Sequence, residues 1–371
     1  MRRLLVISHP AAVSINQLVY QELANRGMEV TIVVPSHWRH EYAQEAFAPV
    51  ALSGLEGRLV RLPVALAGEP QRHFHLARPG PVIAHAKPDV AFVEAEPYSL
   101  VASQWSQSLS SRSIPFGVQL AENIDRPLPR VVRTMRRAVL RRAAFVAARS
   151  ETAARLARSW GALGRVAFAP HAVPLWQVQS ARSGSRPFTV GYAGRLAPEK
   201  GLGDLVAAVC RLRAPVELLL AGNGELREVL DGQPIPGSRV RVLTGLSHDQ
   251  MAGAYGRMDV LALPSRSTPR WKEQFGRAIV EALWCGVPVV GSDSGEIPWL
   301  IELTGGGLTF PEGDIDALSA RLAQMRYDPG LRARLAATGR SAVERFFAVP
   351  AATDALQDLL QTASTGRLVT R

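Results

Sequence analysis

Lysine and cysteine are nearly absent from this sequence. Only Lys87, Lys200 and Lys272 occur among 371 residues, so the net charge of +11 rests almost entirely on arginine. A basic surface attracts phosphate groups, but an excess of arginine over lysine is typical of a GC-rich genome, and we expect no nucleic-acid partner. The two cysteines, Cys210 and Cys285, lie in apolar helical contexts, which indicates buried free thiols in a reducing compartment and argues against a disulfide framework.

Long apolar runs and a dinucleotide-binding fingerprint are also missing. No run of about 18 apolar residues occurs, which argues against a membrane-spanning helix. The apolar run near the start, Leu4 to Ile7, is too short for a signal peptide and is predicted to be a first strand, so we expect a cytoplasmic protein. The turn after it, residues 8–13, has no Gly-x-Gly-x-x-Gly sequence, which argues against dinucleotide binding in this half of the chain.

Short β-branched runs alternate with helical patterns along the whole chain. The length and an apolar fraction of 47% are sufficient for two cores, and the alternation predicts two α/β domains, each with a parallel sheet. Strands are predicted at residues 4–8, 29–34, 58–62, 89–93, 115–120, 145–149, 188–193, 216–220, 240–243, 259–262 and 287–290. The predicted boundaries are an N-terminal domain at 1–175, a linker at 176–187, a C-terminal domain at 188–347 and a last helix within 348–371, which could cross back to the N-terminal domain.

Ligands of parallel sheets bind beyond the carboxyl ends of the strands. In the N-terminal half, polar side chains follow the predicted strands at this edge: His9, Glu94, Glu96, Glu122, Asn123, Ser150 and Glu151. We expect them to share one rim of a cleft. His9 could contact a substrate, although a local hydrogen bond within its own loop is an equally good interpretation.

In the C-terminal half, two carboxylates stand eight positions apart in the stretch from Lys272 to Pro298. Glu281 lies in an otherwise apolar helical run and should be buried, so it requires hydrogen-bond donors. Glu273 lies in the loop before this helix, and Gly276 allows a close approach of the backbone at the helix start, where free amides favour an anion. This pattern indicates the lining of a cleft more than a metal site.

Two cations share one strand-to-helix turn upstream of this stretch. Arg195 and Lys200 lie in the segment Gly-Arg-Leu-Ala-Pro-Glu-Lys-Gly at 194–201, directly before a helix predicted from Leu202. Positive charge beside a helix N-terminus, with glycines that leave room for the backbone, is typical of a diphosphate site. Arginine and lysine in loops are often simply solvated, but in a chain with so few lysines we favour the phosphate interpretation.

Two further charged patterns have ordinary structural interpretations. The helix predicted from Arg130 to Arg142 carries a possible apolar stripe of Val131, Val132, Met135 and Val139 among its arginines. Such a helix could contact an anionic membrane, and we favour a core-facing helix with a solvated arginine face. The pair Asp314 and Asp316 marks a helix start, where acids commonly act as caps, and is not predicted to bind metal.

Together, the turn at 194–201, Glu273-Gln-Phe-Gly276 with Glu281, Gly286-Val-Pro-Val-Val and Ser292-Asp-Ser-Gly295 resemble the retaining glycosyltransferases of family 4, the glycosyl transferases group 1. This resemblance covers essentially the whole chain. It implies the GT-B fold, in which two Rossmann-like parallel-sheet domains face each other across a cleft. It also implies that the C-terminal domain binds a nucleotide-sugar donor and that the N-terminal domain mainly binds the acceptor.

The resemblance assigns roles to particular residues. Arg195 and Lys200 match the pyrophosphate ligands, Glu281 the ribose ligand and Glu273 the donor-sugar ligand. Gln274, Phe275 and Gly276 complete the donor-sugar loop, Gly222 lies in a second glycine-containing loop, and Thr244 lies where the nucleobase packs. No cofactor and no metal are implied, since the nucleotide sugar, of UDP or GDP type, is a co-substrate.

The N-terminal half departs from the family pattern. Many members carry a histidine after the strand that runs here from Pro115 to Leu120, whereas this chain has Ala121-Glu122-Asn123. Glu96 matches an acidic loop on the preceding strand. We therefore place Glu122 at the reacting centre, and we treat His9, Glu96 and Asn123 as further candidates on the acceptor side.

The resemblance implies transfer with retention of configuration, an α-linkage and no protein nucleophile, with Arg195 and Lys200 stabilising the departing diphosphate. The acceptor could be a lipid-linked glycan, a polysaccharide precursor or a secondary metabolite, and the basic helix could contact the inner face of a membrane. Two alternatives remain open from the residues alone: a nucleotide-sugar epimerase or phosphorylase on the same fold, and a non-catalytic basic binding protein.

Overall fold

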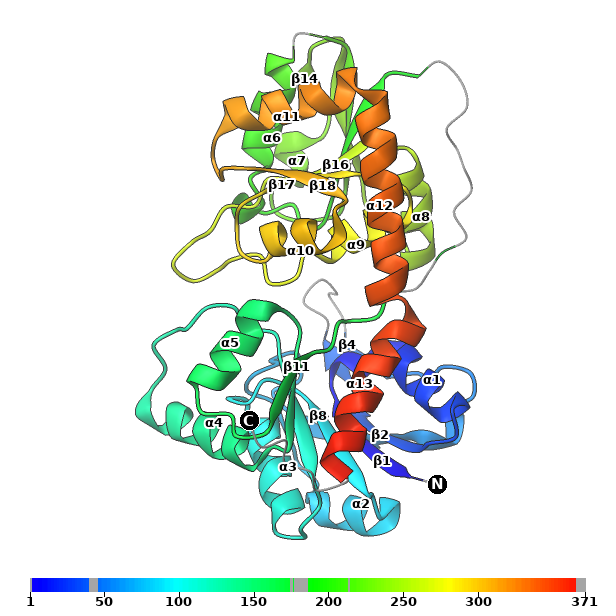
Figure 1. The fold of residues 1–371 in the computed structure, drawn as a ribbon, viewed down its shortest axis with the longest axis vertical. Helices are drawn as coiled ribbons and strands as arrows, with labels where there is room; N and C mark the ends of the chain where they lie inside the picture. Colours follow the sequence, from blue (N-terminus) through cyan, green and yellow to red (C-terminus); the bar gives the residue numbers. More distant parts are fainter. Residues whose placement is uncertain (1, 40–45, 174–175, 177–185, 213, 365–371) are drawn as a thin grey trace. The chain divides into compact units, whose positions relative to one another are not determined.

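The computed structural model describes residues 2–39, 46–173, 176, 186–212 and 214–364 (Figure 1). It divides the chain into two compact units: the first is Met1–Pro174 together with Val349–Arg371, and the second is Leu175–Ala348. Each unit has its own core. The α/β class is therefore confirmed, and each unit is described below by itself.

The described part of the first unit is built on a seven-stranded sheet whose order is β11-β10-β9-β8-β1-β2-β5, with every pairing parallel. The strands are β1 (Arg3–Ser8), β2 (Glu29–Pro35), β5 (Leu59–Leu62), β8 (Val90–Glu94), β9 (Phe116–Leu120), β10 (Phe145–Ala148) and β11 (Arg165–Phe168). The central strands are buried along nearly their whole length, which explains why they read as continuous apolar runs and do not alternate.

Helices and short connecting elements surround this sheet. The helices are α1 (Leu18–Asn25), α2 (Pro79–Ala86), α3 (Leu100–Ser110), α4 (Arg130–Arg142), α5 (Glu151–Ser159) and α13 (Val349–Ser364). Short 3-10 helices lie at η1 (Pro10–Ala12), η2 (Ser14–Gln17) and η3 (Glu56–Arg58), and two small hairpins are formed by β3 (Trp38–Arg39) with β4 (Ala46–Phe47) and by β6 (Val64–Ala65) with β7 (Phe74–His75).

The helix α13 returns the end of the chain to the first unit, where it packs beside α1 (Figure 1). Leu359 and Leu360 of α13 are buried in the same apolar cluster as Leu23 of α1. Polar contacts fix the helix from outside, because Arg165 donates to the Asp358 carboxylate over 2.6 Å and Arg26 pairs with Asp354. Burial of leucines stabilises such a docked helix far more than these exposed ion pairs do.

The described part of the second unit is built on another seven-stranded sheet, with the order β14-β15-β13-β12-β16-β17-β18. The strands are β12 (Phe188–Ala193), β13 (Val216–Ala221), β14 (Pro234–Ile235), β15 (Ser238–Leu243), β16 (Val260–Leu263), β17 (Val289–Ser292) and β18 (Gly307–Phe310). The pairings are parallel except at the edge, where β14 runs antiparallel to β15. The helices are η4 (Pro198–Lys200), α6 (Leu202–Arg211), α7 (Arg227–Leu230), α8 (His248–Gly256), α9 (Arg277–Trp284), α10 (Ile297–Thr304), α11 (Ile315–Tyr327) and α12 (Pro329–Phe347).

One prediction about a helix face is wrong. Val131 of α4 does not belong to a buried stripe, because 71% of it is exposed. Arg136, which the sequence analysis placed on the solvated face, is buried instead, and its guanidinium stacks on the Trp160 ring at 3.8 Å from the centroid. The arginine stem and its stacked head cover apolar surface in the way that a hydrophobic residue would.

Two smaller predictions are confirmed. Cys210 and Cys285 do not form a disulfide, and the first is half-buried and the second buried. Asp314 caps α11 by accepting a hydrogen bond from the Ala317 amide over 2.8 Å. Within the described ranges, no helix has both the length and the apolar character needed to cross a bilayer.

Candidate functional site

The strand order of the second unit places its candidate site. The first strand of this unit, β12, pairs with β13 on one side and with β16 on the other, so the direction of the chain's progress across the sheet reverses between β12 and β16. A crevice forms beyond the carboxyl ends of strands at such a point, and ligands of α/β sheets bind there. The segments that leave these two strands are 194–201 and 264–276, which contain the residues that the sequence analysis selected.

Glycines allow two backbone segments to lie against each other at this edge. The Leu196 amide donates to the Asn223 carbonyl over 2.8 Å, so the turn after β12 pairs with the turn after β13. A Cβ added to Gly222 would lie 1.8 Å from the Gly194 carbonyl oxygen, and one added to Gly224 would lie 2.3 Å from that of Leu196. No side chain fits at these distances, so the predicted glycine loop owes its glycines to the close approach of another backbone.

The turn after β12 is joined to the loop after β16 by an ion pair. Lys200 Nζ lies 2.6 Å from Glu273 Oε2, and the Ser265 hydroxyl donates to the same oxygen over 3.0 Å. Only 14% and 12% of the two charged side chains are exposed. Lys200 also lies over the Trp271 ring, 4.5 Å from its centroid. The sequence analysis assigned Lys200 to the diphosphate and Glu273 to the sugar of one nucleotide sugar. The structure brings these two side chains together.

Arg195 lies in the same turn and pairs with Glu199 one helical turn along the chain. About a third of its side chain is exposed, so this cation faces solvent more than Lys200 does. Lys200 directly precedes Gly201, the N-cap of α6, whose first amides are free donors, and Arg195 lies earlier in the same turn.

Helix α9 supplies the second carboxylate. It starts after Gly276, whose φ of 66° lies in the left-handed region that glycine adopts without strain. Gln274 and Phe275 precede it in the loop, and the Phe275 ring packs 5.8 Å from that of Phe347. Glu281, about a turn and a half into the helix, is buried with 7% exposure.

The buried Glu281 carboxylate finds its donors within the protein. The Tyr255 hydroxyl donates to Oε2 over 2.8 Å, and Arg277 Nε donates to Oε1 over 2.9 Å. Burial and the adjacent carboxylate raise the pKa of Tyr255 well above its ordinary value, so the hydroxyl remains a donor. The sequence analysis expected a ribose to supply the hydrogen-bond donors that the buried Glu281 requires, and this expectation is wrong. Arg277 and Tyr255 already supply donors to the carboxylate, and its remaining lone pairs stay available to a ligand.

Sequence reasoning missed an aromatic group beside Glu281. Trp176 packs against His248 at 4.7 Å between ring centroids and against Tyr255 at 6.1 Å, and its carbonyl accepts a hydrogen bond from Trp284 Nε1. Thr244, the predicted nucleobase residue, lies between β15 and α8, near the start of the helix that carries His248 and Tyr255. No motif marks Trp176 or His248 in the sequence, since a lone aromatic residue in a linker has no periodicity.

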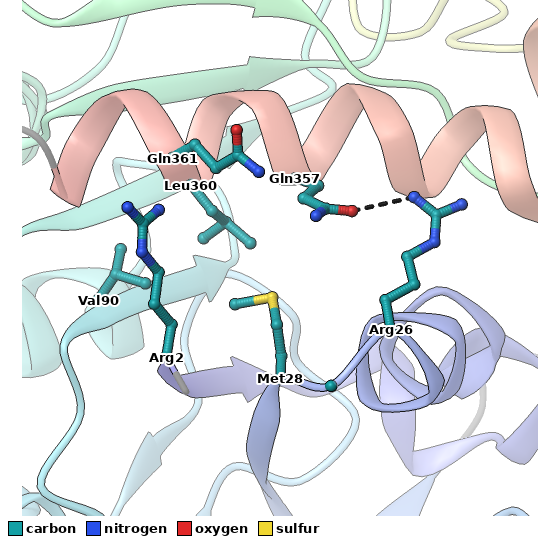
Figure 2. Close-up of a pocket in the computed structure, with 8 residues that line it drawn as sticks. Arg2, Arg26, Met28, Val90, Gln357, Leu360 and Gln361 are labelled. Atoms are coloured by element: carbon teal, nitrogen blue, oxygen red, sulfur yellow. Dashed lines mark hydrogen bonds between the residues drawn. The ribbon is translucent and has the colours of Figure 1, made fainter.

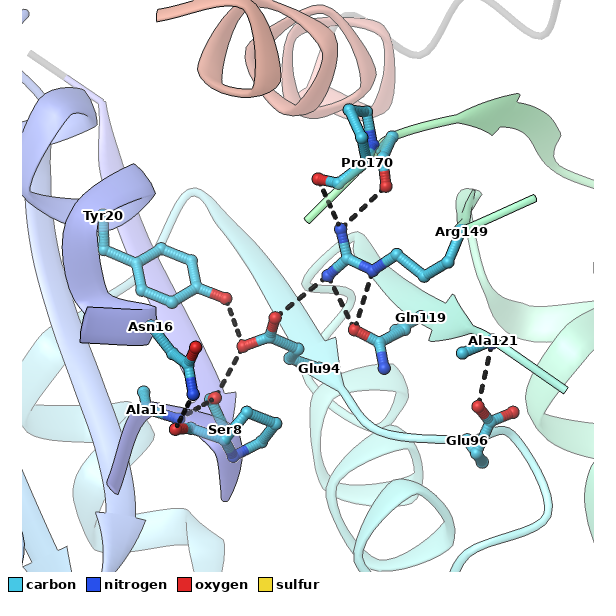
Figure 3. A network of polar contacts seen from close by, with 12 residues as sticks. Ser8, Ala11, Asn16, Tyr20, Glu94, Glu96, Gln119, Ala121, Arg149 and Pro170 are labelled. Atoms are coloured by element: carbon cyan, nitrogen blue, oxygen red, sulfur yellow. Dashed lines mark hydrogen bonds and ion pairs between the residues drawn. The ribbon is translucent and has the colours of Figure 1, made fainter. Parts of the chain in front are cut away.

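In the first unit, the carboxyl edge is organised by a buried ion pair (Figure 3). Arg149, directly after β10, donates to Glu94 Oε1 over 2.9 Å, and both side chains are 7% exposed. The Ser8 and Tyr20 hydroxyls each donate to Glu94 Oε2 over 2.6 Å. The guanidinium also donates to Gln119 and to the carbonyls of 169 and 170. Glu94 is therefore fully engaged in holding the strand ends together.

The other acceptor-side candidates lie at the ends of β8 and β9. Glu122 and Asn123 follow β9 and are buried, with 4% and 8% exposure, and Glu96 is buried beside them. The Glu96 Oε1 atom accepts a hydrogen bond from the Ala121 amide over 2.8 Å (Figure 3). The structure therefore brings Glu96, Glu122 and Asn123 to one place.

His9 lies after β1 in an aromatic cluster with Trp38 and His73, at 5.0 and 5.1 Å between ring centroids. Burial lowers the pKa of His9 to about 3, so its imidazole is neutral at physiological pH. Next along the cluster, His75 Nδ1 accepts a hydrogen bond from Trp105 Nε1 over 2.9 Å, and burial lowers the pKa of His75 to about 3 as well. The structure thus packs His9 with other rings and does not pair it with Glu96 or Glu122.

Two further features bear on the choice of site. Across the residues that the structure describes, no group of three histidines, cysteines or carboxylates is arranged to hold a metal ion. A cavity of about 420 Å³ lies under α13 at the amino ends of β1, β2 and β8, lined by Arg2, Arg26, Met28, Val90, Gln357, Leu360 and other residues (Figure 2). It lies at the opposite edge of the sheet from the strand ends at which ligands bind.

Comparison with solved structures defines the class of fold. Sucrose-phosphate synthase from Thermosynechococcus elongatus superposes with a TM-score of 0.74 over 99% of this chain and 100% of that one, at 19% identity. HepE from Anabaena in complex with UDP gives a TM-score of 0.70 over 98% and 100% of the two chains, at 18% identity. The chain therefore has the GT-B fold, as the sequence analysis predicted.

Comparison of sequences then places the C-terminal half. Residues 177–342 match the family model of the glycosyl transferases group 1. A GDP-mannose-dependent monoacylated phosphatidylinositol monomannoside mannosyltransferase of Corynebacterium glutamicum is 32% identical over 45% of this chain and 45% of its own length. A D-inositol 3-phosphate glycosyltransferase of Xylanimonas cellulosilytica is 33% identical over 42% of this chain and 38% of its own. The chain thus spans less than half the length of these curated relatives.

Proposed function

We propose that this protein is a retaining glycosyltransferase that moves a sugar from a UDP- or GDP-sugar to an acceptor hydroxyl and forms an α-linkage. The observation that carries the proposal is the ion pair between Lys200 and Glu273 at the point where the strand order of the second unit reverses. It lies within the segment that matches the family model. The names of the relatives, which include mannosyltransferases and glycogen synthase, support the same class of reaction.

In this proposal the second unit binds the donor. Arg195 and Lys200 bind the diphosphate together with the first amides of α6. Glu273, Gln274, Phe275 and the backbone of Gly276 hold the sugar, and Glu281 binds the ribose hydroxyls with its remaining lone pairs. Thr244 contacts the nucleobase, and the Gly222 loop lines the same edge. When the diphosphate binds, Lys200 exchanges part of its contact with Glu273 for a phosphate oxygen.

The chemistry proposed for these residues is electrostatic. The bond between the anomeric carbon and the diphosphate oxygen breaks, positive charge develops on the sugar ring, and negative charge develops on the leaving group. Arg195 and Lys200 stabilise that negative charge, and a contact of this kind is worth about 10²–10³ in kcat. The acceptor oxygen bonds to the anomeric carbon, and an oxygen of the departing phosphate takes the proton of the acceptor hydroxyl. The two cations occupy the role that a divalent ion plays in other transferases, so we propose that no metal is required.

The first unit is proposed to bind the acceptor at its carboxyl edge, with Glu122 nearest the reacting centre and His9, Glu96 and Asn123 around it. The acceptor is proposed to be a lipid-linked glycan, with a polysaccharide precursor or a secondary metabolite as the other classes. The name of the Corynebacterium relative, which acts on an acylated phosphatidylinositol mannoside, favours the lipid.

A lipid acceptor requires access to a membrane surface. Helix α4 exposes Arg133, Arg137 and Arg141 together with Val131, which suits a contact with an anionic bilayer. We propose a cytoplasmic protein that associates with the inner face of the membrane through this helix. Flotation with vesicles that contain or lack phosphatidylglycerol tests this proposal: binding that ignores the anionic lipid, or no binding, would remove the membrane from it.

The transferase activity itself is tested with a matched pair of lysine variants. Lys200→Met removes the proposed phosphate ligand, and Lys87→Met removes a lysine at the end of α2 in the other unit. With a panel of UDP- and GDP-sugars, we expect sugar transfer by the wild type and by Lys87→Met, and a loss of about 100-fold or more in Lys200→Met. Turnover of the donor with phosphate but without acceptor would instead indicate an epimerase or phosphorylase. Binding of a nucleoside diphosphate without any turnover would indicate a non-catalytic protein.

A further inference from the structure

Glu96 has one oxygen atom that its surroundings leave without a partner. The residue follows β8 and is 9% exposed. Its Oε1 atom accepts the Ala121 amide hydrogen over 2.8 Å, whereas Oε2 is buried and receives no hydrogen bond. A buried polar atom without a partner is costly, and in a native structure it calls for an explanation, such as a catalytic role or a bound molecule.

Glu122, at the end of the neighbouring strand, is in the opposite situation. Its Oε1 atom accepts the amide hydrogens of 123 and 124, each over 3.1 Å. Its Oε2 atom accepts the Tyr98 hydroxyl over 3.1 Å and lies 3.3 Å from Arg126 Nε. These four contacts engage both oxygens of the carboxylate, so Glu122 has little capacity left for a substrate. Of the two adjacent carboxyl groups, Glu96 is the one with an open hydrogen-bonding atom.

The surroundings of Glu96 favour the protonated acid. Burial raises its pKa from the ordinary 4.5 to about 8, and the negative charge of Glu122 acts in the same direction. The Ala121 amide, the Arg149 guanidinium and the Glu122 amide act in the opposite direction but are weaker than burial. Tyr98 also faces this carboxyl group, and its own pKa is raised far above its ordinary value, so it carries no charge at neutral pH. At pH 7 the open oxygen of Glu96 can therefore carry a hydrogen and donate it.

We propose that Glu96 binds the acceptor as a neutral acid, by donating the hydrogen on Oε2 to a hydroxyl group adjacent to the one that reacts. This inference rests on the proposed function and deepens it. It assigns the acceptor to the class of polyols with neighbouring hydroxyls, such as a sugar or a cyclitol. Because Oε2 is buried, the group that reaches it must be as small as a hydroxyl. The reacting hydroxyl passes its proton to the donor phosphate, so Glu96 is not a base.

The distinction between an acid that donates and a base that accepts is testable with isosteric variants of the full-length protein. Glutamine has the shape of a protonated glutamate, and its amide N–H can donate a hydrogen bond in place of the acid O–H. Glutamine cannot act as a base. Glu96→Gln should keep the KM for myo-inositol or methyl α-mannoside, used as acceptor probes, within about threefold of the wild-type value at pH 7. Glu96→Ala should raise that KM about tenfold or more and leave the KM for the donor unchanged. The exposed Glu29→Gln, at the amino end of β2, should match the wild type.

The pH dependence gives a second arm. With the wild type, kcat/KM for the acceptor should fall above about pH 8, where Glu96 ionises, and this fall should vanish in Glu96→Gln. Between about pH 4.5 and 8 the folded state binds more protons at this position than the unfolded state does. Thermal stability should therefore fall with rising pH more steeply in the wild type than in Glu96→Gln.

Two results would overturn the proposal. One is a loss of about 100-fold in kcat for Glu96→Gln with the acceptor KM intact, since that would make Glu96 a base. The other is an equal dependence of stability on pH in the wild type and in Glu96→Gln. If the wild type transfers no sugar to any probe, the proposed function fails. In that case a rise in Tm on addition of myo-inositol, present in the wild type and lost in Glu96→Ala, supports acceptor binding separately, and an equal rise in both excludes it.

Discussion

Variants of the ion pair between Lys200 and Glu273 can distinguish a role of Lys200 in stability from a role in sugar transfer. Its two charged atoms lie 2.6 Å apart and its side chains are 14% and 12% exposed, so it behaves as a buried pair. Replacement of Lys200 by methionine removes the cation and leaves the Glu273 carboxylate in place. Breaking a buried pair in this way costs about 3–5 kcal/mol. The Ser265 hydroxyl still donates to the carboxylate, so we expect the lower end of that range.

For a unit of this size, a loss of about 3 kcal/mol at about 2–4 °C per kcal/mol lowers Tm by about 6–12 °C. The double variant Lys200→Met with Glu273→Gln removes both charges. It should recover most of this loss, because a pair of neutral groups carries no uncompensated buried charge. The coupling energy between the two positions should then be about 2–3 kcal/mol. Sugar transfer should stay at least about 100-fold below the wild type in both variants, because both lack the proposed phosphate ligand.

Thermal unfolding of the four proteins in this cycle, with sugar transfer measured in parallel, decides between the two roles. The physical reasoning fails if the double variant is as unstable as Lys200→Met, since the charge of Glu273 would then not be the source of the loss. The functional assignment fails if the double variant regains transfer along with stability, since Lys200 would then serve only to neutralise Glu273.

Three further outcomes follow from the structure. Glu281→Gln should weaken nucleoside diphosphate binding about tenfold in calorimetry. The amide nitrogen of glutamine replaces one carboxylate oxygen, so a hydrogen-bond donor stands where the ribose and tyrosine hydroxyls need an acceptor. Gly222→Ala should lower Tm by several degrees or prevent folding, because its Cβ would meet the Gly194 carbonyl oxygen at 1.8 Å. Between about pH 6.5 and 4, the wild type should lose unfolding free energy more steeply than His75→Gln. Burial holds this histidine neutral in the fold with a pKa of about 3, so the unfolded state binds the extra proton as pH falls.

Matched controls exist for each of these measurements. Glu302→Gln changes an exposed carboxylate on α10 and should leave nucleotide affinity unchanged. Gly203→Ala changes a glycine in α6 that has open space around it and should raise stability by about 0.5–1 kcal/mol. His37→Gln changes an exposed histidine, and its unfolding free energy should fall at acid pH as steeply as that of the wild type. If a variant and its control showed equal effects, the physical cause given for that variant would be wrong.

Much of the fold follows from the sequence because its signals are local. The β-branched runs and the helical patterns between them predicted parallel α/β sheets, and parallel sheets place their ligands at the carboxyl ends of the strands. The run Glu273-Gln-Phe-Gly276 and the turn with Arg195 and Lys200 were recognisable for the same reason: each is a short segment in which spacing alone carries the pattern. The GT-B fold that the resemblance of these segments implied is confirmed, whereas the roles of these residues stay predictions.

The tertiary structure alone decided which distant groups meet. Nothing in the sequence pairs Glu281 with Tyr255, 26 positions earlier, or Arg149 with Glu94, 55 positions earlier, because such contacts depend on the order of the strands in the sheet. For the same reason Arg136 was assigned to solvent, although Trp160 at the end of α5 covers it. Periodicity indicates which face of a helix is apolar, but topology determines which residue packs on that face. Topology also brings Glu96 and Glu122 to neighbouring strand ends and leaves Glu96 with an oxygen atom that has no hydrogen-bond partner among the described residues.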